Sequence, residues 1–193
     1  ITPRYERNSD IGWGDSMLFE QDIAADDMYA DHPDGGDMLL ADRVYLLENG
    51  HLLRSAMTRG ALSTGGGEGG RVEEYDWNNT LVWSMDISTA TYMQHHDIRP
   101  LPNGNIIMLA VEKKTYAEVI AAGFNPTKLA SEIQQKDIMV PDYVVEIKPT
   151  KPVGGTVVWE WHVWDHLIQN NDRAKANYGD VAAHPELIDV DCN

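Results

Sequence analysis

The residue types in this sequence that could carry out chemistry stand in two short clusters. The first is His95, His96 and Asp97, which precedes an Asn-Gly turn and an apolar run at 106–109. An imidazole beside a carboxylate can be held in one tautomer and act as a base, an acid or a nucleophile. Because side chains alternate along a strand, we expect the two imidazoles to point to opposite sides. A hydrogen-bonded histidine pair that braces the strand is an equally good interpretation.

The second cluster is 159–166, where three Trp and two His fall within eight residues. Trp159 and Trp161 are expected to share one face of a strand. Asp165 is expected to cap a short helix that holds His166 in its first turn, where the dipole disfavours imidazolium. Such groups suit a flat aromatic ligand, although packing between neighbouring sheets would explain one or two of the Trp residues. The candidate ligand-binding residues are Asp97, Trp161, His162 and Trp164.

A metal site is the competing use of these histidines. The sequence has no HExxH motif and no Cys/His array, and His162 and His166 are expected on different elements. The acidic residues in 31–37 flank a Gly pair, but their spacing does not match an EF-hand loop, so a solvated acidic loop is preferred. The sequence therefore predicts neither a metal nor a cofactor.

Composition excludes several kinds of partner. The net charge of −16 disfavours binding to nucleic acid or to an anionic membrane surface. The sequence contains no apolar run of the roughly 18 residues that a membrane span needs. Cys192 is the only cysteine, so no internal disulfide can form, and pairing with another chain is left open. The chain starts at Ile1, which suggests a processed terminus or further residues upstream.

The chain divides into an acidic segment, 1–43, that we expect to be largely loop, and a repetitive part, 44–193. Within the second part, 47–53 matches 101–107 and 72–83 matches 144–159 in character, each pair being a hairpin. Two different hairpins in the same order predict two antiparallel four-stranded units. Asn-Gly at the tips of the first type predicts two-residue type I′ turns, with positive φ at both residues.

An insertion separates the hairpins of the second unit, at about 115–136. Thr115 and Glu118 form a capping-box pattern that opens a short helix, and Gly123 is expected to stop it. Asn125 and Pro126 are expected to start a second helix that runs to about Lys136.

Four-stranded units repeated at this interval are typical of an all-β protein of the β-propeller type. An ordinary β-sandwich is the alternative. A closed propeller needs about four to eight blades, and this chain supplies about two or three. We therefore expect a partial propeller, with the remaining blades from a second chain or from further sequence.

Longer motifs point to a family. HHDIRPLPNGNIIML, VVWEWHVWDHLIQ and NYGDVAAHPELIDVD resemble the bacterial arylsulfotransferases, and the resemblance runs from Tyr45 to the end. It implies a six-bladed propeller, exported to the periplasm or beyond, that moves a sulfuryl group from an aryl sulfate to a phenol. It also implies a ping-pong mechanism through a sulfated histidine. His95 or His96 matches the HHD motif of this family, and His166 matches WDHLIQ.

The resemblance implies that the sulfated histidine itself lies on a blade beyond Asn193. The chain alone is then expected to be inactive, and His95, His96 and His166 become the candidate catalytic residues that surround an external nucleophile. The alternative hypothesis is a non-catalytic propeller module that binds or assembles with another chain. A homo-oligomer is left open, and the expected small-molecule partners are aryl sulfates and phenols.

Overall fold

The computed structural model describes residues 39–58, 62, 69–128 and 139–190. The chain forms two compact units, Ile1–Leu40 and Ala41–Asn193, and the description below concerns the second, together with the start of its first strand. The acidic residues in 31–37 and Cys192 lie outside the described residues, as does most of the segment expected to be loop.

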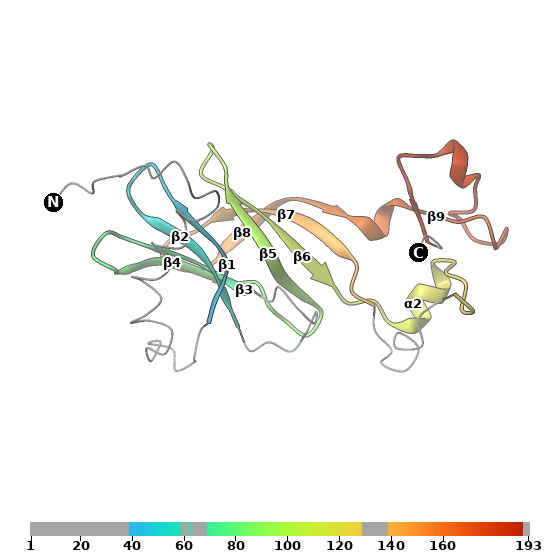
Figure 1. The fold of residues 1–193 in the computed structure, drawn as a ribbon, viewed down its shortest axis with the longest axis horizontal. Helices are drawn as coiled ribbons and strands as arrows, with labels where there is room; N and C mark the ends of the chain where they lie inside the picture. The colour runs from blue at the N-terminus through green and yellow to red at the C-terminus, as the bar shows by residue number, and fades with distance from the viewer. Residues whose placement is uncertain (1–38, 59–61, 63–68, 129–138, 191–193) are drawn as a thin grey trace, which may run out of the picture. The chain divides into compact units, whose positions relative to one another are not determined.

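The fold is mostly β, and it is built from two antiparallel four-stranded sheets whose strands follow one another in sequence order (Figure 1). This confirms the all-β class and the repeated order of hairpins. The first sheet consists of β1 (Leu39–Leu46), β2 (Leu52–Met57), β3 (Gly70–Tyr75) and β4 (Leu81–Asp86). The second consists of β5 (Tyr92–Pro100), β6 (Ile106–Glu112), β7 (Asp142–Pro149) and β8 (Gly155–His162).

The Asn-Gly turns differ from the expected type. The Gly104 N–H donates to Leu101 O at 2.9 Å, and the Leu101 N–H donates to Asn105 O at 2.8 Å. Gly104 has a φ of 82°, but Asn103 does not have positive φ. The type I′ prediction is therefore wrong, and the loop is a three-residue type I turn closed by a left-handed glycine. The turn at 47–51 has the same two hydrogen bonds and a Gly50 φ of 83°, with Glu48 in the place of Pro102, so the Asn-Gly pair takes this form without a proline.

The two sheets pack face to face around one hydrophobic core. Leu53, Val72 and Trp83 contribute from the first sheet, and all three are almost completely buried. The second sheet contributes Ile98, Ile106, Met108, Ala110, Tyr143, Val145 and Ile147. Burial of each large side chain stabilises the fold by about 1.5–3 kcal/mol, so this shared core is what keeps the sheets together.

Polar contacts fix the alignment of the two sheets. The Trp83 indole Nε1–H donates to Gly154 O at 2.8 Å, from β4 to the turn between β7 and β8. The main chain of Ser84 pairs with the same turn, since its N–H donates to Pro152 O and its carbonyl accepts from Gly154 N–H. Lys151 Nζ of this turn lies 2.7 Å from Glu74 Oε1. The turn at 151–155 therefore docks on the first sheet through both backbone and charge.

The opposite face of the first sheet carries a buried ionic layer. Glu73 is fully buried, and its two carboxylate oxygens accept from Arg54 Nε and Arg71 Nε, both at 2.9 Å. The Tyr75 hydroxyl donates to Glu73 at 3.2 Å, and Arg71 also reaches Asp86 at 3.1 Å. A buried charge is tolerated when it is paired in this way, and removal of one partner leaves the others uncompensated.

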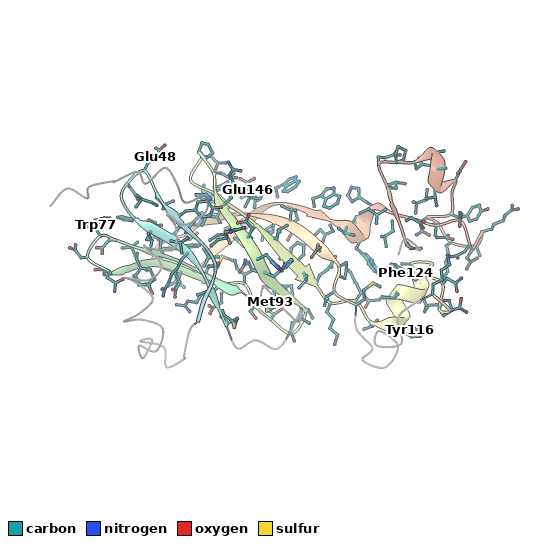
Figure 2. All side chains as sticks on the ribbon, viewed as in Figure 1. Glu48, Trp77, Met93, Tyr116, Phe124 and Glu146 are labelled. Carbon is teal, nitrogen blue, oxygen red and sulfur yellow. The ribbon has the colours of Figure 1, made fainter. Side chains whose placement is uncertain are left out.

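A smaller lobe follows the second sheet. It contains α2 (Tyr116–Ala121), η1 (Val163–His166), η2 (Val181–Ala183) and a parallel pair of short strands, β9 (Leu167–Ile168) and β10 (Ile188–Asp189). Figure 2 labels Tyr116, the first residue of α2, and Phe124, which follows the helix. None of the helices in the described ranges has the length and apolar character that a membrane span requires.

The capping box that opens α2 is confirmed. Thr115 Oγ1 accepts from the Glu118 N–H, and the Glu118 carboxylate accepts from the Thr115 N–H at 2.7 Å. Gly123 follows the helix with a φ of 93°, as expected for a glycine stop. The Asn125 side chain accepts from the Thr127 N–H at 3.0 Å, and 126–128 form a turn and not the start of the expected second helix. The rest of that expected helix, 129–136, lies outside the described residues.

We predict that Glu73→Ala lowers the free energy of unfolding by about 3–5 kcal/mol, because it leaves two arginines buried without their shared carboxylate. Urea denaturation of the purified protein measures this loss. The matched control is Glu48→Ala, which removes an exposed carboxylate of the same sheet and should change stability by less than about 0.5 kcal/mol. Equal losses in the two variants would contradict the proposed importance of the ionic layer.

Candidate functional site

A bulge interrupts β5 at the His-His-Asp sequence. Gln94 pairs with Ala110 and Ile98 pairs with Met108, so three residues of β5 lie opposite one residue of β6. His96 has a φ of 50°, in the left-handed region, which a non-glycine residue enters at a cost of about 1–2 kcal/mol. Bulges often re-aim side chains beside functional sites. The local strain therefore marks this position as a candidate site.

The bulge brings the two imidazoles together. His95 Nδ1 lies 2.8 Å from His96 Nδ1, and the rings meet edge to face with centroids 5.1 Å apart. The expectation that they point to opposite sides is therefore wrong, because the left-handed residue breaks the alternation of the strand. His95 is buried and His96 is exposed, so the pair runs from the interior to the surface.

Asp142, at the start of β7, completes a series of three groups. Its Oδ1 lies 3.0 Å from His95 Nε2, an ion-pair distance, although the angle at the ring N–H is too poor for a hydrogen bond. A carboxylate this close repels a nitrogen lone pair and favours a proton on His95 Nε2. His95 Nδ1 must then accept the proton of His96 Nδ1–H. In the neutral pair, His96 consequently presents an unprotonated Nε2.

Asp97 does not orient either imidazole by any contact in the described residues. Its Oδ1 accepts from Arg43 Nε at 3.1 Å and from the Tyr45 hydroxyl at 3.4 Å, so it connects β5 with β1. Burial, followed by the charge of Asp97, raises the pKa of Tyr45 above its ordinary value. The expected His–Asp pairing is thus made by a different carboxylate, Asp142.

Besides His95 Nε2, two buried polar atoms in the described residues have no hydrogen-bond partner. They are Gln94 Nε2, one residue before His95, and Ser88 Oγ, whose residue forms a β-bridge with Met93. The other end of the Gln94 amide accepts from the Gly70 N–H at 3.1 Å. A Cβ on Gly70 would lie 2.9 Å from the Ser88 Cβ, so a glycine is required there. Unsatisfied buried donors are uncommon and suit a site that takes up a polar ligand or water.

The second cluster lies at the other edge of the same sheet. His162 Nδ1 lies 3.1 Å from Glu112 Oε1, and its ring stacks on Tyr143 at 4.7 Å with the planes almost parallel. Lys114 Nζ also pairs with Glu112, at 2.7 Å. Burial, and then the charge of Glu160, raises the pKa of the Tyr143 phenol well above its ordinary value. His162 is therefore held between a carboxylate and a protonated phenol ring.

His166 is held in a 3-10 turn whose start differs from the prediction. The N-cap of η1 is His162 and has no side-chain cap, and Asp165 lies inside the turn, so its predicted capping role is wrong. Since a carbonyl oxygen only accepts, His166 Nδ1–H donates to His162 O, at 2.8 Å. The His166 ring stacks on Trp161 with centroids 4.6 Å apart.

The tryptophans have separate surroundings. Trp159 pairs with Glu146 and Trp161 with Val144, positions two residues apart on β7, which confirms that these two share one face. Trp164 stacks on Phe124 at 6.2 Å and receives Lys114 Nζ at 5.0 Å from its ring centroid. Trp164 therefore joins the lobe to the sheet.

The two histidine clusters are carried by different strands. β5 and β8 are the opposite edges of the second sheet, and three interstrand spacings of about 4.8 Å separate these two strands by roughly 14 Å. Asp142 lies between them on β7, next to Tyr143, on which the His162 ring stacks. No group of three His, Cys, Asp or Glu residues in the described part of the chain has the geometry to hold a metal ion. The Asp142–His95–His96 series is thus the better candidate for chemistry, and a catalytic role for His166 stays a prediction.

Sequence reasoning missed Asp142, Arg43 and Tyr45. Asp142 is far from the histidines in the chain and carries no local motif, so only the pairing of β5, β6 and β7 could have identified it.

Comparisons with protein-family models, curated proteins and solved structures found no match for this chain.

We predict that His96 is the Nδ1–H tautomer and His95 the Nε2–H tautomer when both rings are neutral. Ring ¹⁵N chemical shifts in long-range ¹⁵N–¹H spectra distinguish the two forms. Asp142→Asn removes the charge that selects this order and should mix the tautomers at both rings. An Nε2–H signal for His96 in the unsubstituted protein would contradict the assignment.

Proposed function

We propose that this protein is part of an exported β-propeller enzyme that transfers a sulfuryl group from an aryl sulfate to a phenol. The observation that carries the proposal is the series Asp142–His95–His96, which starts at a carboxylate and ends at an exposed imidazole nitrogen. Such a series can accept and return a proton at His96 Nε2 while the carboxylate stabilises the cation that forms. The resemblance of the HHD motif to arylsulfotransferases supplies the reaction class.

Two features support the propeller. The sheets repeat the same strand order and pack face to face, as consecutive blades do. The first strand of each sheet is joined to the other by Asp97 and Arg43, so β1 and β5 lie together. In this arrangement the first strand of each blade lies nearest the central opening. The β5 bulge would then face that opening.

In the half-reaction with the donor, an imidazole nucleophile attacks the sulfur of the aryl sulfate. An N–S bond forms, the S–O bond to the aryl group breaks, and the leaving aryl oxygen takes the proton from His96 Nε2–H. The resemblance assigns the nucleophile to a later blade of the propeller. His96 acts as the general acid in this step.

In the half-reaction with the acceptor, His96 Nε2 removes the phenolic proton as the phenol oxygen attacks sulfur. The O–S bond forms, the N–S bond breaks, and the nucleophile regains its lone pair. His96 has then returned to the protonated form that the next donor requires. Asp142, acting through His95, stabilises that form, which makes it a positioning residue rather than a catalytic one.

We predict that the complete protein, with the remaining blades present, releases 4-nitrophenol from 4-nitrophenyl sulfate and that added phenol accelerates the release. His96→Asn should lower kcat by about 10²–10⁴-fold, because a general acid–base group contributes that much. The control is His184→Asn, which removes a half-exposed imidazole paired with Glu186 and should leave the rate unchanged. The absorbance of the released nitrophenolate follows the reaction at neutral pH.

An unchanged kcat in the His96→Asn variant would contradict the role of His96 as general acid and base. Release of nitrophenol that does not respond to phenol would indicate hydrolysis instead of transfer.

The alternative, a non-catalytic module that assembles with another chain, is favoured by one observation: aromatic and aliphatic side chains are exposed on the outer edge of the second sheet.

A further inference from the structure

The turn between β3 and β4 carries the sequence Asn78-Asn79-Thr80. Asn-x-Ser/Thr is the acceptor motif for N-linked glycosylation, in which the middle residue can be any residue except proline. The chain has one other asparagine with Ser or Thr two residues later, Asn125, and there the middle residue is Pro126. Asn78 is therefore the only acceptor that the sequence offers.

The Asp76 carboxylate shapes the turn around this motif. Its Oδ1 accepts from the Asn78 N–H at 2.9 Å and from the Thr80 N–H at 2.8 Å. Hydrogen bonds from the main chain and side chains of Thr80 and Asn78 outweigh desolvation and hold the pKa of Asp76 below its ordinary value. Both residues that define the motif are thus held beside one carboxylate. Asp76 is also the acidic residue that the longer bacterial acceptor motif, Asp/Glu-x-Asn-x-Ser/Thr, includes two positions before the asparagine.

The turn is accessible along its length, since the four residues 77–80 are all exposed. It is also shorter than the equivalent turn of the second sheet. Five residues lie between the paired Tyr75 and Leu81, whereas nine lie between the paired Ile147 and Val157. The longer turn reaches across and docks on the first sheet, but the shorter one ends in solvent. A bulky glycan can be accommodated only at such a surface position.

Trp77, directly before the acceptor, is an exposed aromatic residue without an evident structural purpose. It is 61% exposed, more than any other tryptophan in the described residues, and Figure 2 labels it at this turn. Exposure of so much apolar area to water is unfavourable. The indole ring is flat and apolar on its faces, so it can pack against the C–H face of a sugar attached to the next residue.

We propose that Asn78 is the acceptor of an N-linked glycan and that the first sugar packs against the Trp77 ring. The donor is an oligosaccharide carried on a lipid diphosphate, and a separate oligosaccharyltransferase catalyses the transfer. The proposal requires the export proposed above, but it does not depend on the sulfotransferase chemistry.

In the transfer, Asn78 Nδ2 attacks the anomeric carbon of the donor sugar. An N–C bond forms, the C–O bond to the diphosphate breaks, and the lipid diphosphate leaves with the electron pair. The amide nitrogen loses one proton to a base of the transferase. Because an Asn amide carries two N–H donors, the product keeps one of them.

The test is peptide mapping of the native protein by mass spectrometry, with fragmentation that preserves the N-glycosidic bond. We expect the mass of a glycan on Asn78 and none on Asn125, where the proline blocks the motif. Native protein that carries no glycan on Asn78 would overturn the proposal.

Two substitutions at Thr80 form a matched pair. The turn is held by the main chain of this residue, so both variants keep its hydrogen bond to Asp76. Thr80→Ser retains the hydroxyl and should retain the glycan, whereas Thr80→Ala should lose it, as should Asn78→Gln. A glycan that persists in Thr80→Ala would contradict the use of this motif.

Two further measurements use the Asn78→Gln variant. Oxidation of Trp77 by hydroxyl radicals should be several-fold greater in this variant than in the glycosylated protein, with the exposed Trp159 as internal control. Equal oxidation of Trp77 in the two forms would overturn the proposed sugar contact. Nitrophenol release by the complete protein should be the same in both forms, so loss of the glycan and failure of the sulfotransferase proposal are distinguishable.

Discussion

The contact on which the rest of this structure depends is the packing of Trp83 against the turn at 151–155. The indole is completely buried and donates to the Gly154 carbonyl, so one side chain contributes both apolar area and a directed hydrogen bond. Loss of such a residue from a core typically costs 3–5 kcal/mol. Because the turn belongs to the second sheet and the tryptophan to the first, this contact sets the alignment of the two sheets. The shared core and the Lys151–Glu74 pair form within that alignment.

The β5 bulge is the second feature on which the site depends, because it interrupts the regular alternation of side chains along the strand. A regular strand would send His95 and His96 to opposite faces. The left-handed conformation of His96 costs about 1–2 kcal/mol of conformational free energy and places the two rings in contact. The alignment of β5 with β6 and β7 then sets Asp142 beside His95. Chemistry at this position therefore depends on the regular strands around it, because they hold the irregular residue in place.

The parts of the fold that follow from local sequence were predictable. The hairpins, their order and the Thr115–Glu118 capping box depend on residues within a few positions of one another, and the structure has them where they were expected. The turn type was missed because the Asn-Gly pair occupies the last two positions of a three-residue loop and not both positions of a two-residue loop. Asp165 was misplaced because a cap was inferred from residue type, whereas the turn begins three residues earlier. Asp142 could not be found, since its approach to His95 is a property of strand register.

The ionic layer around Glu73 has a consequence for assembly. A protein with one apolar sheet face at each end would risk adding copies head to tail into an open-ended fibre. The second sheet carries exposed aromatic and aliphatic side chains on β8, whereas the far face of the first sheet is a set of paired charges that is itself buried. A contact between those two faces would set apolar groups against charges that already have their partners. The ionic layer therefore disfavours head-to-tail addition of copies.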